Sequence, residues 1–242
     1  MKIQLFVTCL IDSLFPEVGE AVVEVLQKAG LQIEFPERQT CCGQPAYNAG
    51  YRAEARRMAL HTLEVFSATQ GAVIIPSGSC ADMVKHQYLE LFKDDPENLV
   101  RVQKLAERTY ELSQFLVNVL GITDFGISYQ GKLAYHPSCH LLRGMMVDAQ
   151  PKTLLVATGA DVHPLEAECC GFGGVFSIDQ PEISTEMLQR KMKAIASSGA
   201  DTVVAGDVSC LMHIEGGLRH DGSKVRCAHL AQVLAGKKLG LR

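Results

Sequence analysis

Short apolar runs alternate along the chain with longer segments in which apolar residues recur at helical spacing. A short run of this kind is typical of a buried strand, and the longer pattern is typical of a helix with one buried face. Their alternation predicts an α/β protein with parallel sheets flanked by helices. The expected strands are residues 3–9, 31–35, 72–76, 132–139, 160–165 and 202–206. The expected helices are residues 18–29, 49–68, 97–120, 151–158, 181–198 and 210–218, with another that opens at Cys80.

The pattern occurs twice, and the cysteines mark the repeat most clearly. The first half reads C-x31-CC-x37-C and the second reads C-x29-CC-x39-C. The flanks agree, because "VIIPSGSC" matches "VVAGDVSC" and "ELSQFL" matches "HLAQVL". The chain is therefore predicted to be an internal duplication. The eight repeated cysteines are Cys9, Cys41, Cys42, Cys80, Cys139, Cys169, Cys170 and Cys210.

Two lobes related by a pseudo-twofold axis are the simplest architecture for such a duplication. Each lobe would hold a parallel sheet flanked by helices. Glycine is frequent and helical periodicity lapses in residues 121–131, "GITDFGISYQG". We therefore expect a first repeat lobe over residues 1–125 and a second over residues 126–242.

Composition narrows the class of protein. Of the 242 residues, 47% are apolar and 21% are charged, as in ordinary globular proteins. The net charge of −4 gives no reason to expect nucleic acid or an anionic membrane surface as a partner. The first apolar stretch runs only from Leu5 to Ile11 before Asp12 ends it, which indicates a buried strand rather than a leader. No run is long enough to insert directly into a membrane, so a cytoplasmic protein is expected.

Nine cysteines in a reducing compartment are more typical of metal ligands or catalytic thiols than of disulfides. The eight repeated ones fall where expected strands end or helices begin. The carboxyl ends of parallel strands share one edge of a sheet, so four thiols per half should converge there. The serines of "PSGSC" can cap a helix, and a helix N-terminus favours thiolate over thiol.

The arrangement of the cysteines bears on the kind of metal. Structural zinc sites usually use local C-x2–4-C hooks, which are absent here. Neighbouring thiolates can instead ligate different irons of one cluster, so iron–sulfur chemistry is favoured. Zinc, or thiols without metal, remain alternatives.

The motifs resemble those of the cysteine-rich CCG domain family, duplicated as in the B subunit of heterodisulfide reductase. The whole chain is most similar to the lactate utilization protein A branch. The matching phrases are "FVTC", "TCCGQPAYNAGY", "PSGSC", "YHPSCH", "CCGFGGVFS" and "GDVSCLMHIEGGL". The resemblance implies an iron–sulfur protein, with a 4Fe-4S type of cluster whose number is open. It also implies two partner subunits in L-lactate oxidation to pyruvate, one of them carrying ferredoxin-type clusters.

The chain departs from the reductase pattern, in which each motif ends in C-x-x-C. Met83 and His213 stand where the last cysteine would be, so each half offers four cysteines rather than five. With one ligand fewer, one of the two halves could bind metal weakly or not at all. His213 could replace the missing ligand or lie on a helix surface, and Met83 is expected to be packed.

Four other residues have candidate roles. His140 could hydrogen-bond a cluster or take up a proton, whereas His136 is expected to end a strand. Arg143 could attract a carboxylate or be an ordinary surface arginine. Cys227 has no counterpart in the first half and is expected to be a buried structural thiol.

Three hypotheses for function follow. The leading one is an electron-transfer subunit of a lactate-oxidising complex, an oxidoreductase subunit acting only with its partners, with all eight repeated cysteines as cluster ligands. A second is a thiol or disulfide reductase subunit of the heterodisulfide reductase type. A third is a zinc-stabilised scaffold that assembles partners. No catalytic residue is assigned.

Overall fold

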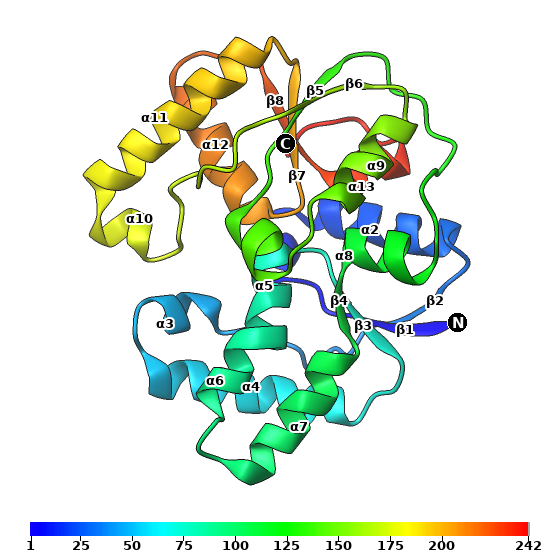
Figure 1. The fold of residues 1–242 in the computed structure, drawn as a ribbon, viewed down its shortest axis with the longest axis vertical. Coiled ribbons are helices and arrows are strands. Elements are labelled where there is room, and N and C mark those ends of the chain that lie inside the picture. Colours follow the sequence, from blue (N-terminus) through cyan, green and yellow to red (C-terminus); the bar gives the residue numbers. More distant parts are fainter. Residues whose placement is uncertain (242) are drawn as a thin grey trace.

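The computed structural model describes residues 1–241, which fold into two lobes, each with a four-stranded sheet (Figure 1). Strand order is β2-β1-β3-β4 in the first lobe and β6-β5-β7-β8 in the second, and every neighbouring pair is parallel. The predicted α/β class with two pseudo-symmetric lobes is confirmed. The strands are β1 (Lys2–Leu5), β2 (Gln32–Glu34), β3 (Ala72–Ile75), β4 (Thr109–Glu111), β5 (Lys132–Tyr135), β6 (Asp161–Pro164), β7 (Thr202–Ala205) and β8 (Arg226–His229).

Helices connect the strands and cover the sheets. Three short segments are π-helical: η1 (Met83–Gln87), η2 (Phe115–Val119) and η3 (His140–Gly144). The α-helices of the first lobe are α1 (Cys9–Leu14), α2 (Pro16–Lys28), α3 (Gln44–Asn48), α4 (Arg52–Ser67), α5 (Gly78–Asp82), α6 (Tyr88–Leu91), α7 (Pro96–Glu107) and α8 (Leu112–Gln114). Those of the second lobe are α9 (Ala149–Ala157), α10 (Phe176–Asp179), α11 (Pro181–Ser198), α12 (Val208–His220) and α13 (Leu230–Ala235).

Helix α2 shows how the sequence sets these elements. Pro16 occupies the first turn, where its fixed φ suits a helix and its missing N–H costs nothing. Val18, Val22 and Val25 recur at helical spacing, and all three are fully buried. The helix therefore forms as expected and turns one apolar face towards the core.

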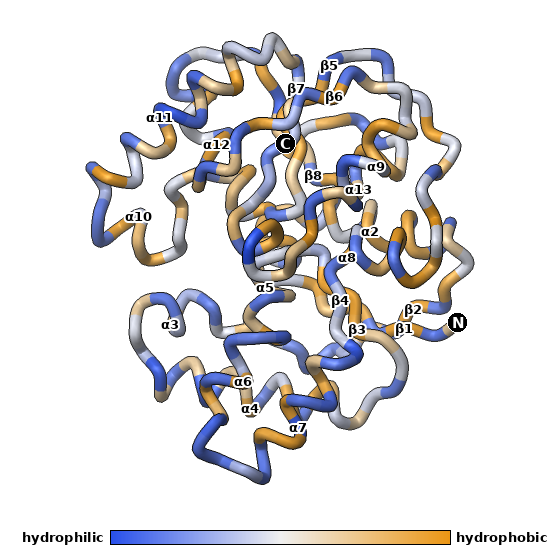
Figure 2. Tube along the Cα trace, viewed as in Figure 1, coloured by the Kyte–Doolittle hydropathy of each residue, from blue (hydrophilic) through white to orange (hydrophobic). Residues whose placement is uncertain are grey.

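The buried face of α2 packs against α13 of the other lobe (Figure 1). Lys28 donates a hydrogen bond from Nζ to the backbone oxygen of Ala235 at 3.1 Å. One hydrophobic core contains residues of both halves, among them Leu5 and Tyr135. Figure 2 shows hydrophobic positions gathering where the lobes meet, around α2 and α5. The two repeats thus share a core.

The prediction of a single helix over residues 97–120 is wrong. Helix α7 ends at Glu107, and β4 then pairs with β3, so that Thr109 lies opposite Val73. Thr109 also donates from Oγ1 to the backbone oxygen of Leu105 and is fully buried. Completing the sheet stabilises an extended segment that periodicity alone could not distinguish from a helix.

The second lobe contains the matching fourth strand, which was also missed. Cys227 lies within β8, opposite Val203 of β7 and just before the final helix. Its side chain is fully buried, as expected of a structural thiol.

Within residues 1–241, no helix combines the length and the apolar character that crossing a membrane requires.

Candidate metal centre

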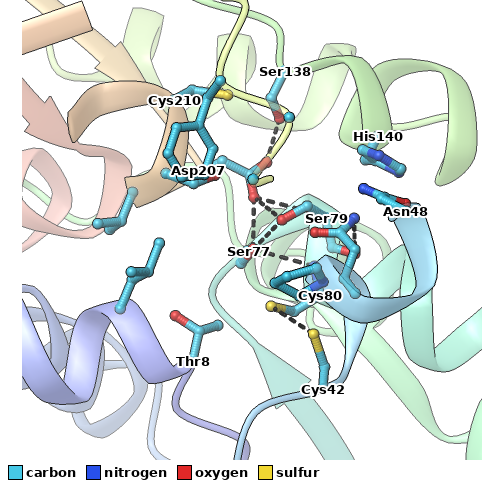
Figure 3. Close-up of a pocket in the computed structure, with 18 of the residues that line it drawn as sticks. Thr8, Cys42, Asn48, Ser77, Ser79, Cys80, Ser138, His140, Asp207 and Cys210 are labelled. Atoms are coloured by element: carbon cyan, nitrogen blue, oxygen red, sulfur yellow. Dashed lines mark hydrogen bonds between the residues drawn. The ribbon is translucent and has the colours of Figure 1, made fainter. Parts of the chain in front are cut away.

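Both sets of four cysteines line one cavity of about 190 Å³ between the lobes (Figure 3). Loops and helix starts that follow the carboxyl ends of the strands carry these residues, as the topology predicts. The sequence analysis expected a pocket in each lobe. The structure instead places the two sets around a shared space.

The first set is built from three segments. Cys9 begins α1, Cys41 and Cys42 lie in the loop before α3, and Cys80 lies in α5. The sulfurs of Cys42 and Cys80 are 3.3 Å apart, and Cys41 contacts both Cys42 and Cys9 through its thiol. Tyr88 donates a hydrogen bond from its hydroxyl to the backbone oxygen of Cys42 at 2.8 Å. This bond fixes the position of Cys42, which is the buried member of the Cys41–Cys42 pair. Four sulfurs are therefore contiguous despite their separation along the chain.

The second set repeats this arrangement. Cys139 and Cys170 both contact Cys169, and Cys170 also contacts Cys210 in α12. The loop then turns sharply at Gly171, whose φ of +93° disfavours any side chain and whose added Cβ would lie 2.6 Å from a backbone oxygen of α11. This turn points the backbone N–H of Gly171 at the Cys169 sulfur, 3.4 Å away.

One cysteine in each set has its pKa lowered by hydrogen bonds from neighbouring cysteines. Hydrogen bonds from Cys42 and Cys9 lower the pKa of Cys41 to about 3. The corresponding bonds around Cys169, chiefly that from Cys139, lower its pKa to about 2. Each set thus has one cysteine that is more acidic than an ordinary thiol and accepts hydrogen bonds from its neighbours. Metal binding at such a set releases the remaining protons.

A buried carboxylate joins the two lobes beside the cysteines. Asp207, 1% exposed, precedes α12 and accepts hydrogen bonds at Oδ1 from Ser77 Oγ at 2.6 Å and from the Ser79 hydroxyl and backbone N–H. Its Oδ2 accepts a bond from Ser138 Oγ (Figure 3). Ser77 also caps α5, because its Oγ accepts from the N–H of Cys80. The carboxylate therefore fixes the two cysteine-bearing helices relative to each other.

Comparison with known proteins places this geometry in a family. The cysteine-rich domain model CCG matches the chain twice, over residues 3–85 and 133–215. Lactate utilization protein A of Oceanobacillus iheyensis is 44% identical over 237 residues, which cover 97% of this chain and 96% of that protein. The same-named protein of Shouchella clausii is 45% identical over 98% of this chain and 100% of its own length. The chain belongs to the lactate utilization protein A family.

Solved structures add little to this assignment. An aspartate racemase homologue from Pyrococcus horikoshii matches over 97% of this chain and 95% of its own, at 12% identity and a TM-score of 0.34. That likeness is too low to support a statement about function.

The second CCG domain contains a histidine that sequence reasoning assigned to the end of a strand. His136 does follow β5 directly, but its ring also lies beside the cysteines. Its ligand nitrogen and the sulfurs of Cys170 and Cys210 all lie within 4.8 Å of one another, and all three residues are buried. This group could hold a metal ion. Aligning the repeats would have flagged His136, because it replaces Phe6.

His140 also faces the cavity, as its candidate role requires. Its Nδ1 lies 2.6 Å from Oδ2 of the buried Asp82, and His86 bonds the other oxygen of that carboxylate at 2.7 Å. The bond to Asp82 raises the pKa of His140. Arg143 instead donates to the backbone oxygen of Ala167 at 2.8 Å, which gives it a structural role in the loop before the second cysteine pair.

The two residues in place of the missing fifth cysteines differ in their surroundings. Met83 is fully buried in the core of the first lobe, as expected. His213 is half-buried, with Nε2 3.4 Å from Ser184 Oγ and its ring beside Phe172. His213 is not part of the His136 group. The ligand role of the eight cysteines stays a prediction.

Glu111 is a buried acid that the sequence analysis did not single out. It is 1% exposed at the end of β4, and burial raises the pKa of its carboxyl to about 7 from an ordinary 4.5. Ser113 Oγ and the N–H of Gln114 donate to Oε2, so the side chain caps α8. The folded chain therefore holds a proton there that the unfolded chain loses at lower pH.

This proton predicts a specific pH dependence of stability. The Glu111 contribution is fully present below pH 4.5 and declines as the pH rises through 7, because the unfolded state then binds fewer protons. In Glu111→Gln this decline should disappear, while the amide oxygen still accepts from Gln114. Thermal unfolding at pH 5 and pH 8 measures it. Glu107→Gln, at an exposed site, should keep the parent pH dependence; equal pH dependence in both variants would contradict the prediction.

Proposed function

We propose that this chain is the iron–sulfur electron-transfer subunit of a complex that oxidises L-lactate to pyruvate. The observation that carries the proposal is the convergence of two sets of four cysteines on one cavity. The relatives are named for lactate utilization, which supports the choice of reaction.

The donor set fits an iron–sulfur cluster. Thiolates are the ligands such clusters use, and each set offers four sulfurs in contact. Adjacent sulfurs such as Cys41 and Cys42 can bind different irons of one cluster. The cavity adds space beside both sets. When bound, a cluster supplies one-electron redox chemistry.

The residues of the chain have distinct parts in this proposal. The eight cysteines would hold the metal, and Asp207 keeps α5 and α12 in register beside it. His140, oriented by Asp82 through Nδ1, lies where a proton could be taken up at its other ring nitrogen. The fixed backbone at Gly171 orients an N–H towards the Cys169 sulfur.

Oxidising the alcohol carbon of lactate to a ketone releases two electrons and two protons, which an accepting cofactor must take up. The proposal therefore includes partners. As the family resemblance implies, we place two other subunits beside this chain, one with ferredoxin-type clusters. The complex would work in the cytoplasm.

Metal analysis of three variants tests the proposal. The chain is purified without oxygen, and iron, acid-labile sulfide and the electron paramagnetic resonance spectrum are measured. Cys42→Ser and Cys170→Ser should each remove about half of the iron, because each disables one set. Cys227→Ser is the matched control, since this buried thiol belongs to neither set, and it should keep the full content.

Two outcomes contradict the proposal. A colourless parent chain that contains zinc and lacks iron would favour the zinc scaffold instead. Iron that stays unchanged in Cys42→Ser and Cys170→Ser would remove the cysteines from the ligand set. Lactate-dependent dye reduction by the chain with its co-expressed partners then tests the reaction itself.

A further inference from the structure

His136 is a buried polar side chain that lacks the bonds its burial demands. It is 0% exposed, and within residues 1–241 neither Nδ1 nor Nε2 has a hydrogen-bond partner. Buried polar groups are normally paired, because leaving one unpaired costs free energy. Replacement by an apolar residue would avoid this cost. The imidazole therefore needs a partner outside the polypeptide.

The position of the ring identifies what such a partner would be. A ring nitrogen and the sulfurs of Cys170 and Cys210 lie within 4.8 Å of one another. Around one metal ion, with bonds of roughly 2.0–2.3 Å, nitrogen and sulfur ligands lie roughly 3–4 Å apart. A small movement would therefore bring all three onto one metal. Imidazole and thiolate are both common ligands of zinc and iron.

The first lobe has no such nitrogen. His136 stands three residues before Cys139, and Phe6 stands three residues before Cys9. Phe6 is 1% exposed, and its ring packs against Phe66 at a centroid distance of 5.2 Å. The duplication therefore places an apolar ring at one set of cysteines and a nitrogen donor at the other.

We infer that His136 ligates the metal of the second cysteine set, so that the two lobes hold different centres. The second centre has mixed thiolate and imidazole ligands, and the first has thiolates alone. This inference rests on the proposed function for the identity of the metal, but not for the presence of the histidine ligand.

The difference in ligands has a consequence for electron transfer. The second centre has an imidazole donor beside the same number of thiolates as the first, and the identity of the ligands is one of the factors that set the reduction potential of a metal centre. In a potentiometric titration the two centres should therefore show different midpoint potentials.

Cobalt binding to the metal-free chain tests the ligand. Cys42→Ser with Cys80→Ser disables the first set, and Co²⁺ alone is then titrated into this background. In His136→Phe, which copies Phe6, the affinity should fall by at least about tenfold and the absorption bands should shift. In His220→Asn, the control at an exposed histidine of the same lobe, both the affinity and the absorption bands should match the background.

Stability separates ligation from a structural role. The melting temperature of metal-free His136→Phe should rise, because an unpaired buried group is removed, while the gain in melting temperature on adding Co²⁺ should shrink. If the histidine only packed, its replacement would lower the melting temperature of the metal-free chain and leave the gain on adding Co²⁺ unchanged. His136→Asn provides a smaller variant if phenylalanine does not fit, and it should show the same loss of Co²⁺ affinity.

On the iron-loaded chain, labelling histidine with ¹⁵N should change the hyperfine coupling of the second centre, and His136→Phe should abolish that coupling. Unchanged Co²⁺ affinity in both His136 variants would overturn the inference, as would nitrogen coupling that survives in them. Failure of the proposed function gives a different result. A parent chain that contains no iron and no sulfide would contradict the iron–sulfur cluster, while the Co²⁺ titration would still show whether His136 is a metal ligand.

Discussion

Replacing Gly78 with alanine should lower the free energy of unfolding by about 3 kcal/mol, because the lobes touch at this residue without room for a methyl group. A Cβ at Gly78 in α5 would lie 2.8 Å from the Cα of Leu141 and 3.0 Å from its backbone nitrogen in η3. These are backbone atoms of a buried residue in the other lobe, so no side-chain rotation can relieve the clash. Urea unfolding followed by circular dichroism measures the loss.

Gly216→Ala provides the matched control. Gly216 is exposed within α12, and a Cβ there would meet no atom within 4 Å among the described residues. Alanine is the better helix former by about 1 kcal/mol, so this variant should be more stable than the parent. Equal stability of Gly78→Ala and the parent would show that the lobes separate easily, and the close packing of α5 on η3 would then be unimportant.

Asp207→Ala is the second large effect, again about 3 kcal/mol of destabilisation, because it leaves several buried donors without an acceptor. Ser77, Ser79 and Ser138 all donate to this carboxylate from the two lobes. The variant should also bind metal more weakly, since α5 and α12 lose their fixed relation. Urea unfolding and iron content measure the two effects.

Ser209→Ala is the control for Asp207. Ser209 lies two residues further on in α12, lines the same cavity and is the repeat counterpart of Ser79. It should change stability by less than about 0.5 kcal/mol, as expected for a site outside a buried network. If Asp207→Ala were no more destabilising than Ser209→Ala, the carboxylate would not be what joins the lobes.

The sequence was sufficient to predict the duplication, the parallel sheets and the convergence of the cysteines. These follow from spacing and from the rule that strand ends share an edge, which needs no knowledge of packing. It failed at β4, where Thr109 to Glu111 interrupts what reads as a helix. Three residues are too few to establish a period, and pairing with β3 decides their conformation.

The buried polar residues could not be predicted for a related reason. Asp207 reads as an ordinary helix-capping residue, yet its partners come from the other half of the chain. Glu111 reads as an exposed acid, and only burial shows otherwise. His136 is distinctive only when set against Phe6 and when its nitrogens are known to be unpaired. The role of Asp207 depends on contacts between the halves, and the roles of Glu111 and His136 depend on burial in the folded chain. Spacing along the sequence encodes neither.

The bond between Ser77 and Asp207 also bears on how the molecule arose. The two residues are 130 positions apart and occupy equivalent places in the repeats. In an ancestral homodimer, exact twofold symmetry would have put the same residue on both sides of the axis. Two aspartates there would have repelled each other, and two serines would have carried no charge. A chain that carries both repeats is free of this restriction, so a serine can face an aspartate across the pseudo-twofold axis.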